Sequence, residues 1–270
     1  MSKNNLSKIS ANTLFHFTKK RETLVSILEN TFYPRYCWEN ISTIEQNNQA
    51  TFPDFAVPIV SFCDIPLSQV GDHVKTYGNF AIGLKKEWGV KNGLNPVFYI
   101  EPKSDVAKDI RKIADISSNA LSVAYKAGAS IFIELGDGLT QLAIYTKLHK
   151  GRFFRGGVFE PEIFNFYDER EWRYVPRVKK IRDLNVSRVL TWGFAKKPGN
   201  ELIFDNWNNV IKKANLNFEP DDVKYIIVEK EGDILTLANE LKRIKSRFSE
   251  DQIILLTTRL ISMENIKEDF

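Results

Sequence analysis

Hydrophobic and polar residues alternate along several short segments of the chain, which is the pattern of strands with one buried face. In LFHFT, residues 14–18, Phe15 and Phe17 point to one side of the predicted strand, and His16 and Thr18 point to the other. A histidine held on a strand can hydrogen-bond a ligand hydroxyl, whereas the alternative is a core histidine whose hydrogen bonds are satisfied. Further strands are predicted at VPIVSFC (57–63), NFAIGL (79–84) and NPVFYIE (95–101).

Helical spacing of apolar residues separates these strands. The spacing in KRETLVSILEN (20–30) predicts one helix, and LSQVGDHVKTYG (67–78) predicts another that ends at Gly78. Residues 103–150 are predicted to be mostly helical, as two helices broken near residues 136–138. Closer to the C-terminus the pattern predicts a strand (223–230), a helix (233–248) and a second strand (252–258).

These elements predict one α+β domain over residues 13–270, preceded by a flexible tail at residues 1–12. Residues 221–270 are predicted to add a C-terminal βαβ-like extension, and residues 41–54 are expected to form a polar loop. The N-terminal segment lacks the apolar core of a signal peptide, and no run of about 18 apolar residues predicts a membrane helix. We therefore expect a cytoplasmic protein.

Composition and charge exclude few functions. The 270 residues are 43% hydrophobic and 12% aromatic, with a net charge of +4, which permits a polyanionic partner without requiring one. The chain has neither of the common glycine-rich phosphate-binding motifs, and it lacks the HExxH and GxSxG motifs. With only three histidines and two cysteines, Cys37 and Cys63, neither a metal centre nor a disulfide framework is expected.

Two acidic residues stand out in NFYDEREWRYVP, residues 165–176, of which we predict DEREWRYVP, residues 168–176, to be a strand. Glu169, Glu171 and Arg173 would share one face, and Trp172 and Tyr174 would anchor the other face in the core. Two carboxylates at this spacing repel each other, which can raise the pKa of one of them. The alternative is an exposed strand face whose charged residues pair with their neighbours.

Other polar and aromatic residues also permit two interpretations. His73 and Tyr77 share one helix face and can line a pocket, or Tyr77 can pack in the core with the valines of the same helix. Arg35, between two tyrosines, can bind phosphate or lie at the surface. The basic run at residues 147–155 contains two phenylalanines and can contact nucleic acid, or it forms a solvated loop.

Long motifs in the chain resemble a known family of phage-resistance proteins. The segments VSFCDIPLSQVGDHVKTYGNFAIGLKKEWG, LFHFT, LNPVFYI, NFYDEREWRYVP and ISMENIKEDF are similar to the AbiGi abortive-infection family, and the resemblance extends from about residue 13 to residue 270. That family is labelled as the antitoxin of an abortive-infection pair. The resemblance implies a non-catalytic antitoxin or sensor that binds a partner toxin or a phage component.

A more distant resemblance concerns the order of histidine, tyrosine and glutamate, which is similar to that of mono-ADP-ribosyltransferases. It implies a split β-sheet core with flanking helices, and an enzyme that transfers ADP-ribose from NAD to a nucleic acid or protein, or hydrolyses NAD. The chain departs from that family in two respects. An ExE pair there accompanies an arginine, not a histidine, on the first strand, and Tyr77 here lies on a predicted helix beside His73. Carried over, Glu171 and Glu169 would be catalytic, and NAD would be held by His16, Thr18, Arg35, Tyr77 and His73.

The sequence thus leaves three functions open: an enzyme that uses NAD, a non-catalytic antitoxin, and a metal-dependent nuclease that uses Asp64, Glu169 and Glu171. The first makes a geometric prediction. His16 and Glu171 should line one cleft, on neighbouring or facing strands.

Overall fold

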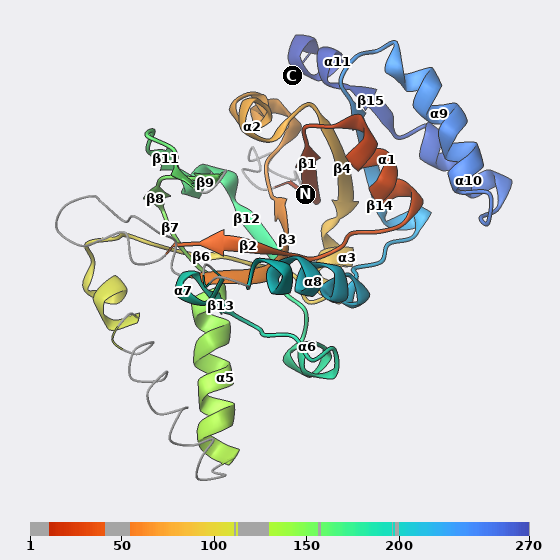
Figure 1. Cartoon of the computed structure of the whole chain (residues 1–270). Helices are drawn as coiled ribbons and strands as arrows, with labels where there is room; N and C mark the ends of the chain where they lie inside the picture. Colours follow the sequence, from red (N-terminus) through yellow and green to blue (C-terminus); the bar gives the residue numbers. More distant parts are fainter. Residues whose placement is uncertain are drawn as a thin grey trace, which may run out of the picture.

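The computed structural model describes residues 11–40, 55–110, 112, 130–155, 158–195, 197 and 200–269. The predicted loop at residues 41–54 and most of the predicted tail lie outside these residues. In the described part, the main sheet has nine strands in the order β15-β14-β4-β1-β3-β12-β5, with β2 and β13 also pairing with β3. Only β14 and β15 are parallel in this sheet, so the fold is α+β with a mixed sheet (Figure 1).

Several strands of the main sheet lie close to predicted segments, whereas β13 and β15 were not predicted. The strands of this sheet are β1 (Thr13–Thr18), β2 (Arg35–Glu39), β3 (Phe55–Cys63), β4 (Phe80–Lys85), β5 (Asn95–Pro96), β12 (Glu171–Tyr174), β13 (Leu190–Thr191), β14 (Val223–Val228) and β15 (Leu260–Ser262). Three short pairs lie outside this sheet: β6 (Phe98–Ile100) with β7 (Thr146–Leu148), β8 (Lys150–Gly151) with β11 (Phe164–Asn165), and β9 (Phe154–Arg155) with β10 (Val158–Phe159).

Helices flank the main sheet. They are α1 (Arg21–Glu29), α2 (Gly71–Tyr77), α3 (Lys86–Lys91), α5 (Ser130–Ile144), α6 (Val178–Asp183), α7 (Trp192–Ala195), α8 (Glu201–Ile211), α9 (Asp233–Ile244), α10 (Glu250–Thr257) and α11 (Met263–Asp269). Short 3₁₀ turns are η1 (Leu67–Gln69), η2 (Phe166–Glu169), η3 (Lys212–Ala214) and η4 (Pro220–Asp222). In Figure 1, α9, α10 and α11 lie together beside β14 and β15, whereas α5 extends away from the sheet.

Strand β3 divides the main sheet into two parts. Residues 60–63 pair with β12, and Cys63 also faces β1, whereas residues 55–59 pair with β2 and residues 55–56 with β13. Because β3 pairs with different strands along its length, β1, β2 and β12 all lie next to it. This arrangement positions the candidate site described below.

The first strand packs on both of its faces. Phe15 and Phe17 belong to one buried cluster together with Val70 and Val74 of the α2 region, as the alternation predicts. Leu14, on the other face, is fully buried in a second cluster with residues of α1 and α9. The face that carries His16 is therefore largely apolar, which differs from the polar face that the sequence predicts.

Two predicted elements are wrong. Helix α5 continues through residues 136–138 without a break, and the hydroxyl of Thr140 donates to the carbonyl of Gly136 within it. Residues 250–257 form helix α10 instead of a strand, because Ser249 and Gln252 form a capping box at its start. A short apolar run does not separate strand from helix by itself. The strand parallel to β14 is β15, so the C-terminal extension has two helices between its strands.

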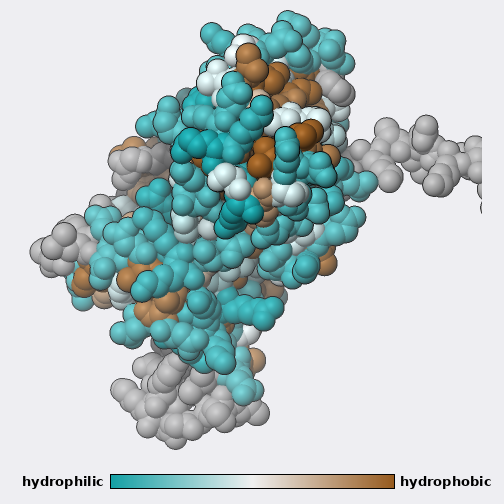
Figure 2. All heavy atoms as spheres, turned by 90° about the vertical axis from the view of Figure 1, so that its right-hand side faces the viewer, coloured by the Kyte–Doolittle hydropathy of each residue, from teal (hydrophilic) through white to brown (hydrophobic). Residues whose placement is uncertain are grey.

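Helices α9 and α10 leave several large apolar side chains exposed. These include Leu235, Ile254 and Leu255. Figure 2 looks onto the side of the molecule where these helices lie, and it shows brown hydrophobic patches in the upper half of a mostly hydrophilic surface. Among the described helices, none combines the length and the apolar character needed to cross a membrane.

We expect Gly78→Ala to lower the free energy of unfolding by more than about 2 kcal/mol. Gly78 ends α2 with φ +107° and ψ 171°, a conformation that residues with a Cβ rarely adopt. An added Cβ would also collide with the backbone of Thr18 and Lys19 at the end of β1. Urea unfolding measures the loss.

Gly71→Ala is the matched control, since Gly71 begins the same helix and a Cβ there meets nothing within 4 Å. This variant should leave stability unchanged or raise it by about 0.5 kcal/mol. Equal losses in the two variants would contradict the close packing of α2 on β1.

Candidate functional site

A cavity of about 1200 Å³, here called the cleft, lies beside β1, β2, β3 and α2. Six of the seven residues predicted for the site line it: His16, Arg35, His73, Tyr77, Glu169 and Glu171. Thr18, which pairs with Phe80 of β4 at the end of β1, does not line the cleft. Asp64 is also outside the cleft, where it forms an ion pair with Lys86, so the three acids of the nuclease hypothesis do not meet.

His16 lies on β1 and is fixed by β3. Its Nδ1 atom is 2.8 Å from the carbonyl oxygen of Ser61, and its ring packs against Phe32 and Phe62 at centroid distances of 5.3 and 5.7 Å. Burial lowers the pKa of His16, and the hydrogen bond to Ser61 only partly opposes this. A neutral ring that donates from Nδ1 leaves Nε2 as a hydrogen-bond acceptor.

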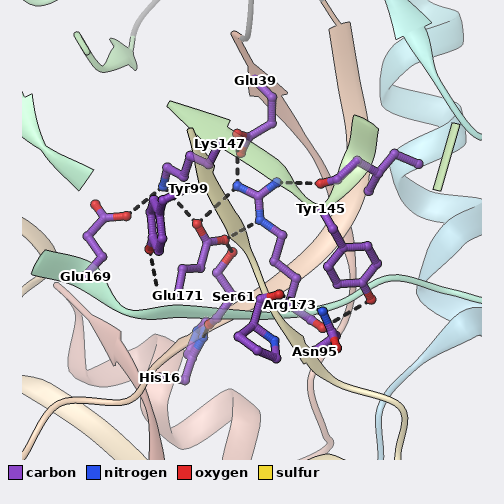
Figure 3. A network of polar contacts seen from close by, with 12 residues as sticks. His16, Glu39, Ser61, Asn95, Tyr99, Tyr145, Lys147, Glu169, Glu171 and Arg173 are labelled. Carbon is purple, nitrogen blue, oxygen red and sulfur yellow. Dashed lines mark hydrogen bonds and ion pairs between the residues drawn. The ribbon is translucent and has the colours of Figure 1, made fainter. Parts of the chain in front are cut away.

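Glu171 begins β12 and is enclosed by hydrogen-bond donors (Figure 3). Its carboxylate accepts from the Ser61 hydroxyl at 2.7 Å, from Lys147 Nζ at 2.8 Å and from Arg173 Nε at 2.6 Å. Burial alone would raise the pKa of Glu171, but Arg173 and Lys147 outweigh burial and hold this pKa well below its usual range. The expected rise in pKa is therefore wrong for Glu171.

Glu169 reaches the same lysine by a turn that the sequence does not predict. It ends the 3₁₀ turn η2, and Arg170 follows with φ +44°, so Glu169 is not on the strand with Glu171. Its carboxylate accepts from Lys147 Nζ at 2.6 Å and from the hydroxyl of Tyr77. The predicted shared strand face is wrong, yet both carboxylates contact one ammonium group.

Arg173 completes what is here called the carboxylate network, formed by Glu39, Glu169 and Glu171 with Lys147 and Arg173. The Arg173 side chain has an exposed fraction of 0%, and it contacts Glu171, Glu39 at 2.9 Å and the carbonyl oxygen of Ile144 at 2.8 Å. The sequence pattern did not indicate that Ser61, Glu39 and Lys147 contact Glu171 or Arg173. The alternation of β12 correctly placed Glu171 and Arg173 on one face, but the expected pairing was with neighbouring strands, whereas the two side chains pair with each other.

The two rings of α2 both face the cleft. The centroids of His73 and Tyr77 are 4.5 Å apart, and His73 also meets the edge of Phe17 at 5.0 Å. Burial raises the pKa of Tyr77 well above its usual range, with Glu169 adding to the effect. Tyr77 also packs against the core cluster that contains Val70 and Val74, so both interpretations of this helix hold.

Cationic and aromatic side chains form the outer part of the cleft. Arg35, Arg152 and Lys213 line it, are exposed, and have no ion-pair partner among the described residues. Trp38 and Phe154 line it as well, and each packs against Trp192 at a centroid distance of 5.0 Å. The cleft therefore combines buried acids, each paired with Lys147 or Arg173, with exposed basic side chains and aromatic rings.

We expect His73→Asn to flatten the pH dependence of stability between pH 6.5 and pH 5. Burial lowers the pKa of folded His73 to about 4, and Lys147 adds to this effect. The unfolded chain binds a proton below about pH 6.5 that the folded protein does not bind, so stability falls as pH falls.

The loss assigned to His73 is about 2 kcal/mol over this interval. Urea unfolding at both pH values measures it as the difference between the wild type and the variant, which cancels the contributions that the two proteins share. If the free energy of unfolding changed equally with pH in the two proteins, the burial of a neutral His73 would be contradicted.

Comparison with known proteins gives two matches. A family model described as "Putative abortive phage resistance protein AbiGi, antitoxin" matches residues 30–229. The abortive phage resistance protein AbiGi of Lactococcus lactis subsp. cremoris is 28% identical over 263 residues, which cover 88% of this chain and 99% of that protein. No solved structure matches the fold.

Proposed function

Because this chain belongs to the AbiGi family of abortive phage resistance proteins, we propose that it acts as an antitoxin that binds a partner toxin through its cleft. The description of the matching family supports the antitoxin role. The cleft supports binding, because its entrance offers exposed cations and aromatic rings. Such side chains contribute strongly to recognition when a partner covers them.

The observation that carries this proposal is that the carboxylates of Glu169 and Glu171 are already paired with cations of the protein. Glu169 and Glu171 both accept from Lys147, and Glu171 is also bound by Arg173. Cleavage of the nicotinamide bond of NAD develops positive charge, which a nearby carboxylate must stabilise. A carboxylate already paired with two fixed cations has little attraction left for a third.

ADP-ribosyl transfer from NAD is the second candidate function, and one observation favours it. His16, Tyr77 and the segment that carries Glu169 and Glu171 are far apart in the sequence, yet all four residues line the same cleft. The volume of about 1200 Å³ is sufficient for a dinucleotide. In this function NAD would be the substrate, and Glu171 would have to exchange its contact with Lys147 for one with the substrate.

One pair of variants separates the two functions. Glu171→Gln removes the carboxylate that transfer requires, and Glu39→Gln removes another carboxylate that binds the same arginine. Antitoxin binding predicts that both variants protect cells against phage. Transfer predicts that only Glu39→Gln does.

A further inference from the structure

A second hollow, of about 700 Å³, lies where α3, α6 and η3 meet beyond the end of β12. Four cationic side chains line it: Lys91, Arg177, Lys180 and Lys213. No aspartate or glutamate is among the described residues that line this hollow. Its remaining polar lining includes the side chains of Asn92 and Asn215.

The four cations are available to a ligand. Each is exposed, and none forms an ion pair with another described residue. Like charges gathered around one hollow repel each other and raise the local electrostatic potential, which attracts anions. The second hollow therefore favours an anionic ligand with several charges over a neutral one.

The basic surface continues from this hollow to the cleft. Lys213 lines both, and Lys212, Arg35 and Arg152 line the cleft beyond it. The three acids that line the cleft do not cancel these charges, because all of them are held by Lys147 or Arg173. Cations thus line both the second hollow and the cleft, and Lys213 is common to the two.

The aromatic side chains of the cleft favour a nucleic acid over an acidic peptide as the bound polyanion. Trp38, Phe154 and Phe159 line the same cleft as Arg35, Arg152 and Lys213. Proteins that bind single-stranded nucleic acids combine a basic groove for the phosphates with aromatic rings on which the bases stack. An acidic peptide would use the same cations but has no regular series of flat bases.

We propose that the second hollow binds the phosphates of a single-stranded nucleic acid whose strand continues past Lys213 to the entrance of the cleft. The inference stands on side chains outside the carboxylate network. At the entrance of the cleft, a bound strand and the toxin proposed above would compete for the same cations.

Fluorescence anisotropy with full-length protein and labelled oligo(dT) or oligo(U) of about 12 nucleotides tests the proposal. Lys180→Ala removes a cation of the second hollow. Lys179→Ala removes the preceding residue of the same helix, which is exposed but does not line the hollow. The double variant Arg177→Ala/Lys180→Ala extends the series.

We expect Lys180→Ala to weaken binding about fivefold at 0.1 M salt, and to reduce the slope of log K against log salt by about 0.7. For the double variant, the decrease in log K and the reduction of the salt slope should each be about twice as large. Lys179→Ala should bind as tightly as the wild type does. Equal losses in Lys179→Ala and Lys180→Ala would overturn the proposal, as would no binding by the wild type. Displacement by poly-glutamate as effective as by unlabelled oligonucleotide would overturn it in favour of an acidic protein partner.

Discussion

Arg173→Met is expected to lower the free energy of unfolding by about 3–5 kcal/mol, the range found when one partner of a buried ion pair is removed. The Arg173 side chain is fully buried and contacts the carboxylates of Glu171 and Glu39. Methionine fills much of the same volume, but it leaves two buried carboxylates with Lys147 as their nearest cation. Urea unfolding measures the loss.

Arg177→Met is the control for this change, because Arg177 follows the same strand but is exposed. It should change stability by less than about 0.5 kcal/mol. The double variant Glu171→Gln/Arg173→Met adds a test of pairing, since the loss caused by Glu171→Gln should shrink once Arg173 is absent. A loss below about 1 kcal/mol for Arg173→Met, or strict additivity in the double variant, would contradict the network.

The order of elements could be predicted from local pattern. The apolar segments at residues 14–18, 57–63 and 79–84 place β1, β3 and β4 correctly, because these strands bury nearly all of their apolar side chains. Gly78 predicts the end of α2 for a conformational reason that its positive φ bears out. The family resemblance is confirmed by the comparisons.

The contacts of the site could not be predicted, because they depend on pairing between distant segments. Lys147 reads as one member of a basic run, yet the pairing of β7 with β6 brings its ammonium group to Glu169 and Glu171. The left-handed backbone of Arg170 is equally invisible, since the pattern continues the strand through Glu169. Arg173 and Lys147 then lower the pKa of Glu171 although burial opposes them, whereas repulsion between the two carboxylates was expected to raise the pKa of one of them.

The central claim is that the carboxylate network is structural and that the cleft works by binding. Glu171→Gln and Glu39→Gln form a matched pair for this test. The side chains of Glu171 and Glu39 are only 6% and 12% exposed, and both bind Arg173. Each variant removes one negative charge with little change in shape. Their unfolding midpoints, compared beforehand, show whether both proteins are folded at the temperature of the assay.

The efficiency of phage plating on cells that carry the wild type, Glu171→Gln or Glu39→Gln is the most direct measurement. The account predicts that both variants, at equal protein levels, reduce plating as much as the wild type does. Loss of protection confined to a folded Glu171→Gln, together with NAD breakdown in wild-type cells that this variant abolishes, would contradict the account and favour ADP-ribosyl transfer.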